Sequence, residues 1–505
     1  MSFENVKTVG IIGAGVSGIS TAKILLGEGF DCTVFERSGE LGGVWADGYS
    51  NFGVQVQKEL YEFPDWPLPA DTPNFTPGPI FQKYLAAYCN EFGVSSHIRL
   101  GTEVTRVSAR EDGQDGWRIK YREDGEEHET KFDLLVICVG AFSNQPYLPG
   151  FPGLGQFEGE SIHNSAFKTR DQVAGKRVAV LGYGKSATDA ALEAVAVAAE
   201  TSIIVRTPHW PVPRKLAGVL PFKWGMLHRM TSALLPLYQR SSGLEHTVHT
   251  LGAPLVWLYW RLTQVLLYFQ CRLGGSSDNR PDLVPSVPIE IGAFDHTTMV
   301  VRPEFFGLVR NGVIGAHQTE IQEFTKTGVI LRDGSQLDVD IVIFATGWRT
   351  DYAFFDDEIL AKINIEDDGY YLYRHMVQPD LAGMIFIGCN ALTYESILTY
   401  NLQARWLAEL LKGKHGLPDR ATMHHEIEDM KAWKREWMPA NHARGASIGL
   451  HQLHYHDELL RDFGANPKRK KGLFAPLKEL IDPYEPNDYR SIVSGVWEQE
   501  EIRRV

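Results

Sequence analysis

Val9-Gly10-Ile11-Ile12-Gly13-Ala14-Gly15-Val16-Ser17-Gly18 is the stretch that decides the fold of this chain. The apolar run Val9–Ile12 is typical of a strand that is buried on both faces. The first glycine allows a tight turn, the second lets the backbone approach a pyrophosphate, and the third lets a helix pack on the strand. Because free N–H groups and the helix dipole favour negative charge at the helix start, the stretch predicts a dinucleotide site.

A second strand and further glycines extend this site and indicate which dinucleotide it binds. The strand-like run Cys32–Phe35 ends in Glu36, 18 residues after Gly18, where an acidic residue is expected to bind ribose hydroxyls. Arg37 follows, and then Gly42-Gly43-Val44-Trp45. Paired glycines bring the backbone close to a bulky ligand, and a tryptophan can lie against it, so the pattern favours FAD. Packing in the core is the alternative for Trp45.

The same motif recurs farther along the chain with a different residue after its second strand. Arg177–Leu181 leads into Gly182-Tyr183-Gly184-Lys185-Ser186-Ala187, in which alanine is an accepted third small residue. The next strand, Ser202–Val205, is followed by Arg206 and Thr207. An arginine there can pair with a 2′-phosphate, which a carboxylate would repel. The second site is therefore predicted to bind NADPH. Lys185 and Arg214 are further candidates, although a solvated surface charge is the favoured interpretation of each.

Length and composition limit the remaining classes of protein. A chain of 505 residues is too long for one ordinary core, and 44% hydrophobic with 22% charged residues is typical of a folded protein. The net charge of −13 disfavours nucleic acid as a partner. The five cysteines lack CxxC spacing, which argues against a disulfide framework, a metal site or a dithiol reductase. The start of the chain lacks the pattern of a secretion signal, so we expect a cytoplasmic protein.

The order of these patterns predicts an α/β fold with two Rossmann-like dinucleotide-binding domains and a helical insertion. We expect the division that follows: residues 1–165 as the first part of the FAD-binding domain, 166–340 as the NADPH-binding domain with the insertion at about 216–285, 341–450 as the second part of the FAD-binding domain, and 451–505 as a C-terminal extension of helical or irregular structure.

One apolar stretch inside the insertion requires a test for membrane contact. Leu251 to Phe269 is 19 residues long, so as a helix it approaches the thickness of a bilayer core. Arg261 at its centre and Pro254 near its start disfavour a span. The favoured interpretation is a buried or surface-docking helix, and an interfacial membrane helix is the next alternative. Any peripheral membrane contact is therefore expected to come from residues 216–271.

The segment before the second glycine motif resembles a known family. Phe157-Glu158-Gly159-Glu160-Ser161-Ile162-His163-Asn164-Ser165-Ala166-Phe167 matches the pattern FxGxxxHxxx(Y/F) of the flavin-containing monooxygenases, which are relatives of the Baeyer–Villiger monooxygenases. Phe167 stands where the closest Baeyer–Villiger enzymes have tryptophan, which favours the branch that oxygenates heteroatoms. Further matches are Glu36-Arg37-Ser38, Lys58-Glu59, Phe63-Pro64-Asp65, Phe344-Ala345-Thr346-Gly347-Trp348 and Gln403-Ala404-Arg405-Trp406.

The resemblance implies a mechanism and further site residues. NADPH reduces FAD, O2 adds to give a flavin C4a-hydroperoxide, and one oxygen atom passes to nitrogen or sulfur in a small molecule. Gln55, between Val54 and Val56, occupies the place of a family asparagine at the reacting flavin edge and is the candidate catalytic residue. Thr346-Gly347 is expected to close a loop over the flavin or to cross between domains. For His163 a hydrogen-bonded linker histidine is favoured over a proton relay.

Several alternatives stay open at this point. Baeyer–Villiger oxidation of a ketone is the first, an NADPH oxidase or flavin reductase is the second, and a non-catalytic flavoprotein is the third. The aromatic insertion, with Trp224, Trp257 and Trp260, is expected to shape or cover the substrate entrance. Its size hints at a bulky metabolite of specialised metabolism, without naming the substrate.

Overall fold

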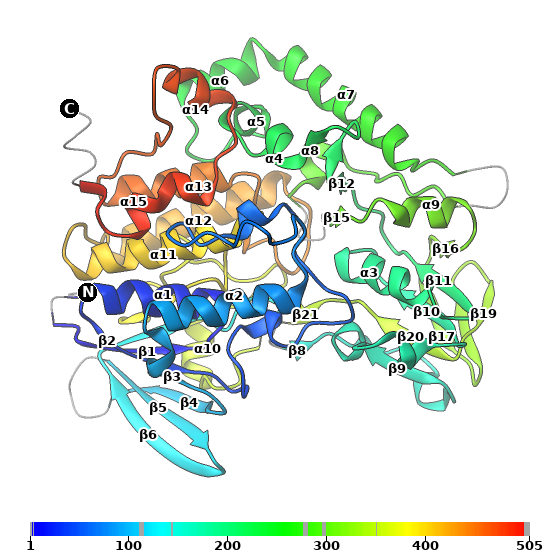
Figure 1. The fold of residues 1–505 in the computed structure, drawn as a ribbon, viewed down its shortest axis with the longest axis horizontal. Helices are drawn as coiled ribbons and strands as arrows, with labels where there is room; N and C mark the ends of the chain where they lie inside the picture. Colours follow the sequence, from blue (N-terminus) through cyan, green and yellow to red (C-terminus); the bar gives the residue numbers. More distant parts are fainter. Residues whose placement is uncertain are drawn as a thin grey trace.

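Two parallel sheets form the framework of the molecule (Figure 1). The computed structural model describes Phe3 and residues 5–110, 116–142, 145–275, 281–294, 299–349 and 351–498. The first sheet has the strand order β22-β7-β1-β2-β3, and the second has the order β16-β11-β10-β20-β9. Every pairing within these two sheets is parallel. The predicted α/β class with two Rossmann-like units is confirmed.

The first sheet is built around the glycine motif that opened the sequence analysis. Its strands are β1 (Thr8–Ile12), β2 (Asp31–Phe35), β3 (Ile98–Arg99), β7 (Leu134–Ile137) and β22 (Met384–Phe386). Helices α1 (Val16–Gly27), α2 (Gly78–Glu91) and α11 (Ser396–Leu411) cover one face, and α1 packs on α11. Because β22 comes from a distant part of the chain, this sheet unites segments more than two hundred residues apart.

The second sheet repeats the arrangement around the second glycine motif. Its strands are β9 (Glu160–His163), β10 (Arg177–Leu181), β11 (Glu200–Ile204), β16 (Gly315–His317) and β20 (Ile341–Phe344), and α3 (Lys185–Ala194) packs on β10 and β11. The predicted boundaries of the NADPH-binding domain lie at residues 165 and 340. In the structure, β9 before the first boundary and β20 after the second both belong to this sheet. The division into domains stays a prediction.

Smaller sheets and one-turn helices connect and flank the two main sheets. The sheet β4 (Glu103–Ala109), β5 (Trp117–Glu123) and β6 (Glu126–Phe132) flanks the first, and the sheet β17 (Ile321–Phe324), β18 (Gly328–Leu331) and β19 (Gln336–Asp338) flanks the second. Two-stranded pairs join β8 (Gln145–Pro146) with β21 (Trp348–Arg349) and β23 (Leu392–Thr393) with β24 (Ser447–Gly449). The 3-10 turns are η1 (Gly43–Trp45), η2 (Lys58–Tyr61), η3 (Val94–His97), η4 (Leu154–Gln156), η5 (Asn164–Ala166), η6 (Arg170–Val173) and η7 (Pro486–Tyr489).

The predicted insertion is helical and lies at one margin of the molecule (Figure 1). It contains α4 (Phe222–Met226), α5 (Arg229–Leu234), α6 (Gly243–Thr250) and α7 (Ala253–Cys271), with the short strands β13 (Lys215–Leu216) and β14 (Leu220–Pro221) before them. Residues 276–280 of the predicted insertion lie outside the described residues. Beside the insertion lie β12 (Pro211–Pro213), α8 (Ile289–Gly292), β15 (Met299–Val301) and α9 (Glu304–Arg310).

Helix α7 is the apolar stretch that required a membrane test. It docks through the buried residues Trp260, Leu267 and Cys271, and the Trp260 indole donates to the Leu234 carbonyl at 2.6 Å. Arg261 forms an ion pair with Glu290, so its charge is compensated at the surface of the protein. No helix in the described part of the chain is long and apolar enough to cross a membrane. Helix α7 thus docks on the surface of the protein through its buried residues, and its contact with a membrane stays a prediction.

The C-terminal part of the chain packs back onto the first sheet and onto the insertion. Its helices are α10 (Asp357–Ile363), α12 (Arg420–Trp437), α13 (Gln452–Asp462), α14 (Ala475–Ile481) and α15 (Arg490–Val493). Helix α13 contacts α11, and α14 contacts α5 of the insertion. The Arg229 guanidinium joins these parts because it donates to both carboxylate oxygens of Asp457, at 2.6 and 2.9 Å.

Candidate active site between two glycine turns

A cavity of about 1960 Å³ lies between the two glycine turns, at the carboxyl ends of the strands that precede them. In open parallel sheets, ligands bind at this edge. Most of the predicted site residues line it: Gly13, Gly15, Val16, Ser17, Glu36, Arg37, Gly43, Val44, Trp45, Gln55, Val56, Gly182, Gly184, Lys185, Ser186, Arg206, Thr207, Thr346 and Gly347. Ala14, Gly18, Val54 and Ala187 are buried behind its wall.

The first glycine turn is shaped by close contact between backbone segments. Gly13 has φ +103°, a conformation that favours glycine, and a Cβ at Gly18 would lie 1.9 Å from the Gly13 carbonyl oxygen. Gly15 and Gly43 face each other across the turn, where the nearest atom to a Cβ on Gly43 would be Gly15 Cα at 3.3 Å. The cavity wall is therefore bare backbone here, which is the surface that a pyrophosphate needs.

Glu36 lies at the end of β2 and is almost fully buried. Its carboxylate accepts hydrogen bonds from the amides of Ala14, at 2.8 Å, and Ser38, at 2.9 Å. These bonds hold the side chain beside the glycine turn, where it lines the cavity. The position fits the expected contact with ribose hydroxyls.

Trp45 both lines the cavity and packs against other aromatic rings. Its ring centroid lies 4.4 Å from that of Phe81 and 5.7 Å from that of Tyr61. The two interpretations of Trp45, ligand contact and core packing, are therefore compatible.

The second glycine turn places an open guanidinium at the far end of the cavity. A Cβ at Gly182 would lie 2.6 Å from the Ala345 carbonyl oxygen, so this turn is tightly packed too. The Arg206 side chain is 77% exposed, and its Nε lies 3.9 Å from Glu320. A guanidinium in this state can bind a phosphate group without first losing a short ion pair.

Lys185 and Arg214 were interpreted as solvated surface charges, and the structure shows that this interpretation is wrong. The Lys185 side chain is 13% exposed and forms an ion pair with Asp189. Burial lowers the pKa of Lys185, and the Asp189 carboxylate opposes that shift. The Arg214 guanidinium lies 3.7 Å from the centre of the Phe75 ring. Both cations therefore contact protein groups, Lys185 through Asp189 and Arg214 through the Phe75 ring.

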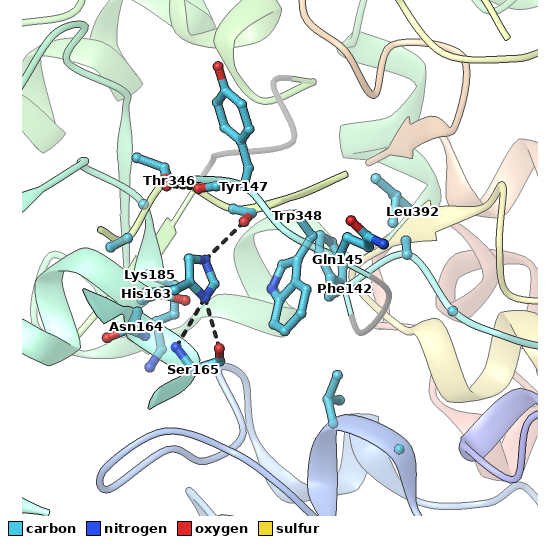
Figure 2. Close-up of a pocket in the computed structure, with 18 of the residues that line it drawn as sticks. Phe142, Gln145, Tyr147, His163, Asn164, Ser165, Lys185, Thr346, Trp348 and Leu392 are labelled. Carbon is cyan, nitrogen blue, oxygen red and sulfur yellow. Dashed lines mark hydrogen bonds between the residues drawn. The ribbon is translucent and has the colours of Figure 1, made fainter. Parts of the chain in front are cut away.

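The crossing between the two sheets is fastened by His163 and Thr346 (Figure 2). His163 Nδ1 accepts from the Ser165 amide at 3.2 Å, and its Nε2 lies 3.0 Å from the Gly347 carbonyl oxygen. Burial lowers the pKa of His163, which favours the neutral ring. Thr346 Oγ1 donates to the Tyr147 carbonyl. The histidine is thus hydrogen-bonded as expected, and Thr346-Gly347 lies where the chain crosses between the sheets.

Gln55 lines the cavity from the segment that joins η1 and η2. Its neighbours Val54 and Val56 are 2% and 3% exposed. Tyr61, Ser396 and Tyr400 line the same cavity. Sequence reasoning missed these three residues because Tyr61 is on η2, whereas Ser396 and Tyr400 are on α11, which is distant in the sequence.

Asp189 and Glu193 are buried acids near the site that sequence reasoning also missed. They sit on α3, four residues apart, and their side chains are 1% and 2% exposed. The signal was present in the sequence, because they are the two acids in the alanine-rich helix after the second glycine motif.

The predicted role of the insertion in covering the substrate entrance receives no support from the cavity wall. None of the described residues between 216 and 285 lines the cavity, and the wall on that side continues from His209 to Ala293. Trp260 packs inward, whereas Trp257 is 61% exposed. The entrance role stays a prediction.

Comparison with known proteins identifies the class. The family model "Flavin-binding monooxygenase-like" matches residues 6–242 and 294–503, and the gap between them contains α6 and α7. The chain is 29% identical over 519 residues to human flavin-containing monooxygenase 1, covering 97% of this chain and 90% of the relative. It is 29% identical over 516 residues to mouse dimethylaniline monooxygenase [N-oxide-forming] 2, covering 97% and 90%.

Solved structures share the fold at lower sequence identity. S-allyl-L-cysteine S-oxygenase from Allium sativum is similar with a TM-score of 0.63 and 20% identity, over 99% of this chain and 94% of that one. An open structure of cyclohexanone monooxygenase gives a TM-score of 0.67 and 19% identity, over 90% and 97%.

These matches, with the two glycine turns on one cavity, define a flavin-dependent monooxygenase. The chain belongs to the flavin-binding monooxygenase-like family, as the sequence motifs predicted. The expected cofactors, FAD and NADPH, are those that flavin-containing monooxygenases use.

Proposed function

We propose that this enzyme transfers one oxygen atom from O2 to a nitrogen or sulfur atom of a small organic molecule. The single observation that carries the proposal is one cavity that is lined by Gln55, by the bare first glycine turn, and by the second glycine turn together with the exposed Arg206. The printed names of relatives support both chemistries, since one is N-oxide-forming and a structural neighbour is an S-oxygenase.

Each cofactor has a set of residues that fits it. We assign FAD to the first turn, with Gly13, Gly15 and Gly43 against the pyrophosphate and Glu36 on the ribose. We assign NADPH to the second turn, with Gly182 and Gly184 against the pyrophosphate and Arg206 on the 2′-phosphate. When bound, FAD supplies the redox chemistry and the activation of O2. The protein binds and orients the cofactors and the substrate, and it excludes water. In this scheme residues 1–165 and 341–450 serve FAD, and residues 166–340 serve NADPH.

Gln55 is the residue that we propose acts at the reacting edge of the flavin. Its amide offers two donors and an acceptor, on a stem one methylene longer than that of asparagine. The neutral side chain can hold a hydrogen bond without adding charge to the site. The described cavity wall also carries hydroxyls from Tyr61, Ser396 and Tyr400.

Baeyer–Villiger oxidation of a ketone is the second candidate, favoured by the structural likeness to cyclohexanone monooxygenase. Phe167 is fully buried, and its carbonyl accepts from the Ser50 amide at 2.7 Å. A larger tryptophan would need more room at this junction, so the site is built around the smaller ring. An NADPH oxidase is the third candidate.

Oxygen uptake with a panel of tertiary amines, thioethers and cyclic ketones distinguishes these activities. The proposal predicts that an amine or thioether lowers the hydrogen peroxide released per NADPH oxidised, and that the product carries one atom of label from ¹⁸O2. Lactone formation would establish the Baeyer–Villiger alternative. One peroxide per NADPH with every compound would favour the oxidase.

We further propose that the insertion contacts a lipid surface, as expected for residues 216–271. Along α7 the outer face exposes Leu255, Trp257, Leu258, Leu262, Val265 and Phe269, by 45% to 72%. Helix α14 adds Leu477 and Leu480, and α14, α5, α6 and α7 contact one another in sequence. These helices follow one margin of the molecule (Figure 1). A continuous apolar margin of this kind is typical of a helix lying in a membrane interface.

Vesicle binding tests this contact. Wild-type protein should sediment with phosphatidylcholine vesicles, and a variant with Leu255→Ser, Leu262→Ser and Phe269→Ser should stay in solution. A control with Val313→Ser and Ile365→Ser removes exposed apolar side chains elsewhere and should bind like wild type. Equal sedimentation of all three proteins would contradict the proposal.

A further inference from the structure

The loop that carries Gln55 is tied to the helix of the other glycine turn by two buried acids. Asp189 and Glu193 are four residues apart on α3, so their side chains project from the same face of the helix. Both face residues 47–57, the segment that leaves η1 and ends in η2. The segment belongs to the FAD side of the cavity, whereas α3 begins at the second glycine turn.

Asp189 is shared between this loop and the second turn. Tyr49 donates its hydroxyl to Asp189 Oδ2 at 2.8 Å, and the Lys185 ammonium donates to the same oxygen. Lys185 is the first residue of α3 and lines the cavity directly after Gly184. One carboxylate oxygen therefore joins a residue of the nucleotide turn to the loop that carries Gln55.

Glu193 fixes the next residues of the loop. Asn51 Nδ2 donates to Glu193 Oε1 at 2.7 Å, while Arg170 and Arg302 donate to its two oxygens at 2.7 and 3.1 Å. Asn51 has φ +54°, in the left-handed region that asparagine tolerates better than most residues. The Ser50 amide donates to Phe167 across the same junction. The loop is thereby held in one conformation.

The burial of these acids makes the arrangement sensitive to movement of the loop. Two carboxylates that are nearly inaccessible to water need hydrogen-bond donors, and removing one partner leaves an incompletely compensated buried charge. Tyr49 and Asn51 supply such donors only while the loop stays against α3. From the FAD side, the Val54 amide is held by the Thr76 carbonyl at 3.0 Å. Gln55 therefore follows a segment that is fixed to both sides of the cavity.

We propose that Asp189 and Glu193 are positioning residues that align Gln55 and the flavin edge with the nicotinamide. The inference rests on the proposed function, because it requires FAD at the first turn and NADPH at the second. Neither acid lines the cavity, so they act through Tyr49, Asn51 and Lys185. The same contacts explain why a helix made largely of alanine carries two buried acids.

The test is the rate of flavin reduction by NADPH in anaerobic stopped flow, using FAD-loaded protein. Tyr49→Phe combined with Asn51→Ala removes both loop donors and leaves the acids paired with Lys185, Arg170 and Arg302. We expect the limiting rate at saturating NADPH to fall about tenfold or more, since small misplacements of reacting groups are costly. The NADPH concentration that gives half the limiting rate should change much less. Asp189→Asn should likewise lower the limiting rate and change the half-saturating NADPH concentration much less.

Tyr371→Phe is the matched control, because this tyrosine also donates to a buried aspartate, Asp368, at 3.0 Å, away from the cavity. It should reduce at the wild-type rate. If the loop variants bind FAD and are reduced at the wild-type rate, even with a lower thermal stability, the acids are structural and the inference is wrong. If NADPH fails to reduce wild-type flavin, the proposed function fails first, and this inference fails with it.

Discussion

Gln55 shows what a single residue contributes to the proposed site. It lines the cavity, and its neighbours Val54 and Val56 are buried. We predict that Gln55→Ala keeps FAD bound but releases most of the oxidising equivalents as hydrogen peroxide. Gln55→Asn should retain more coupling, because it keeps the amide on a shorter stem. Peroxide released per NADPH oxidised is the measurement, and equal coupling in Gln55→Ala and wild type would exclude the role.

Arg206 is the residue on which the preference for NADPH depends. Arg206→Glu replaces a phosphate-binding cation by a repelling anion, so the Kd for NADPH should rise roughly a hundredfold while that for NADH changes little. Lys326→Glu makes the same charge change at another exposed cation that is 74% exposed, and should leave both constants unchanged. Titration of the flavin reduction rate with each nucleotide checks this. A parallel loss for NADH would point to damage of the fold.

His456 links protonation to unfolding. Burial lowers its pKa from 6.5 to about 3, so at pH 5 the ring is neutral in the folded protein and protonated once unfolded. The free energy of unfolding therefore falls as the pH drops below 6.5, by about 1.4 kcal/mol per pH unit, until about pH 3. On denaturation at pH 5, His456→Gln should take up about one proton fewer than wild type, and at pH 8 the two should agree. Equal uptake at pH 5 would contradict the assignment.

At the scale of residues, the sequence could predict the site only where a motif defines a backbone turn. The glycines and Glu36 are such cases, because each has a local geometric role. Lys185 was misread as a surface charge because its partner Asp189 becomes buried only when the loop at residues 47–57 packs on α3. Tyr61, Ser396 and Tyr400 meet through long-range packing, which leaves no local pattern.

Among the elements, β1 and α1 depend on one close contact that a substitution can test. A Cβ on Gly18 would overlap the Gly13 carbonyl oxygen at 1.9 Å, whereas a Cβ on Gly27 in the same helix would meet no atom within 4 Å. Gly18→Ala should destabilise the protein by at least about 2 kcal/mol and lower its FAD content. Gly27→Ala should be neutral or stabilising. Thermal melting and the ratio of flavin to protein absorbance measure both, and equal behaviour of the two variants would contradict this packing.

The elements around the glycine motifs could be predicted almost to the residue, because buried parallel strands are short apolar runs with marked ends. β10 begins and ends as predicted, and β1 and β2 each begin one residue earlier than predicted. The apolar run at 251–269 predicted a helix, but its docking needed the structure, since Arg261 meets Glu290 from a separate segment.

In the whole molecule, the chain passes between the two sheets at two places. The order of motifs in the sequence predicts these places only approximately. β9 and β20 both pair within the second sheet, on either side of the predicted domain boundaries. His163 and Thr346 fasten these crossings to Gly347 and Tyr147, so the cavity between the sheets is held by fixed contacts. This arrangement is what allows one cavity to serve two dinucleotides.

The most direct test of the central claim is a single turnover followed by absorbance. The enzyme is first reduced by NADPH without oxygen and is then mixed with O2 while NADP⁺ stays bound. We predict a transient spectrum that is neither reduced nor oxidised flavin, and whose decay is accelerated by an amine or thioether that the enzyme oxygenates. Direct return to oxidised flavin with one hydrogen peroxide per NADPH, whatever compound is added, would contradict the assignment as a monooxygenase.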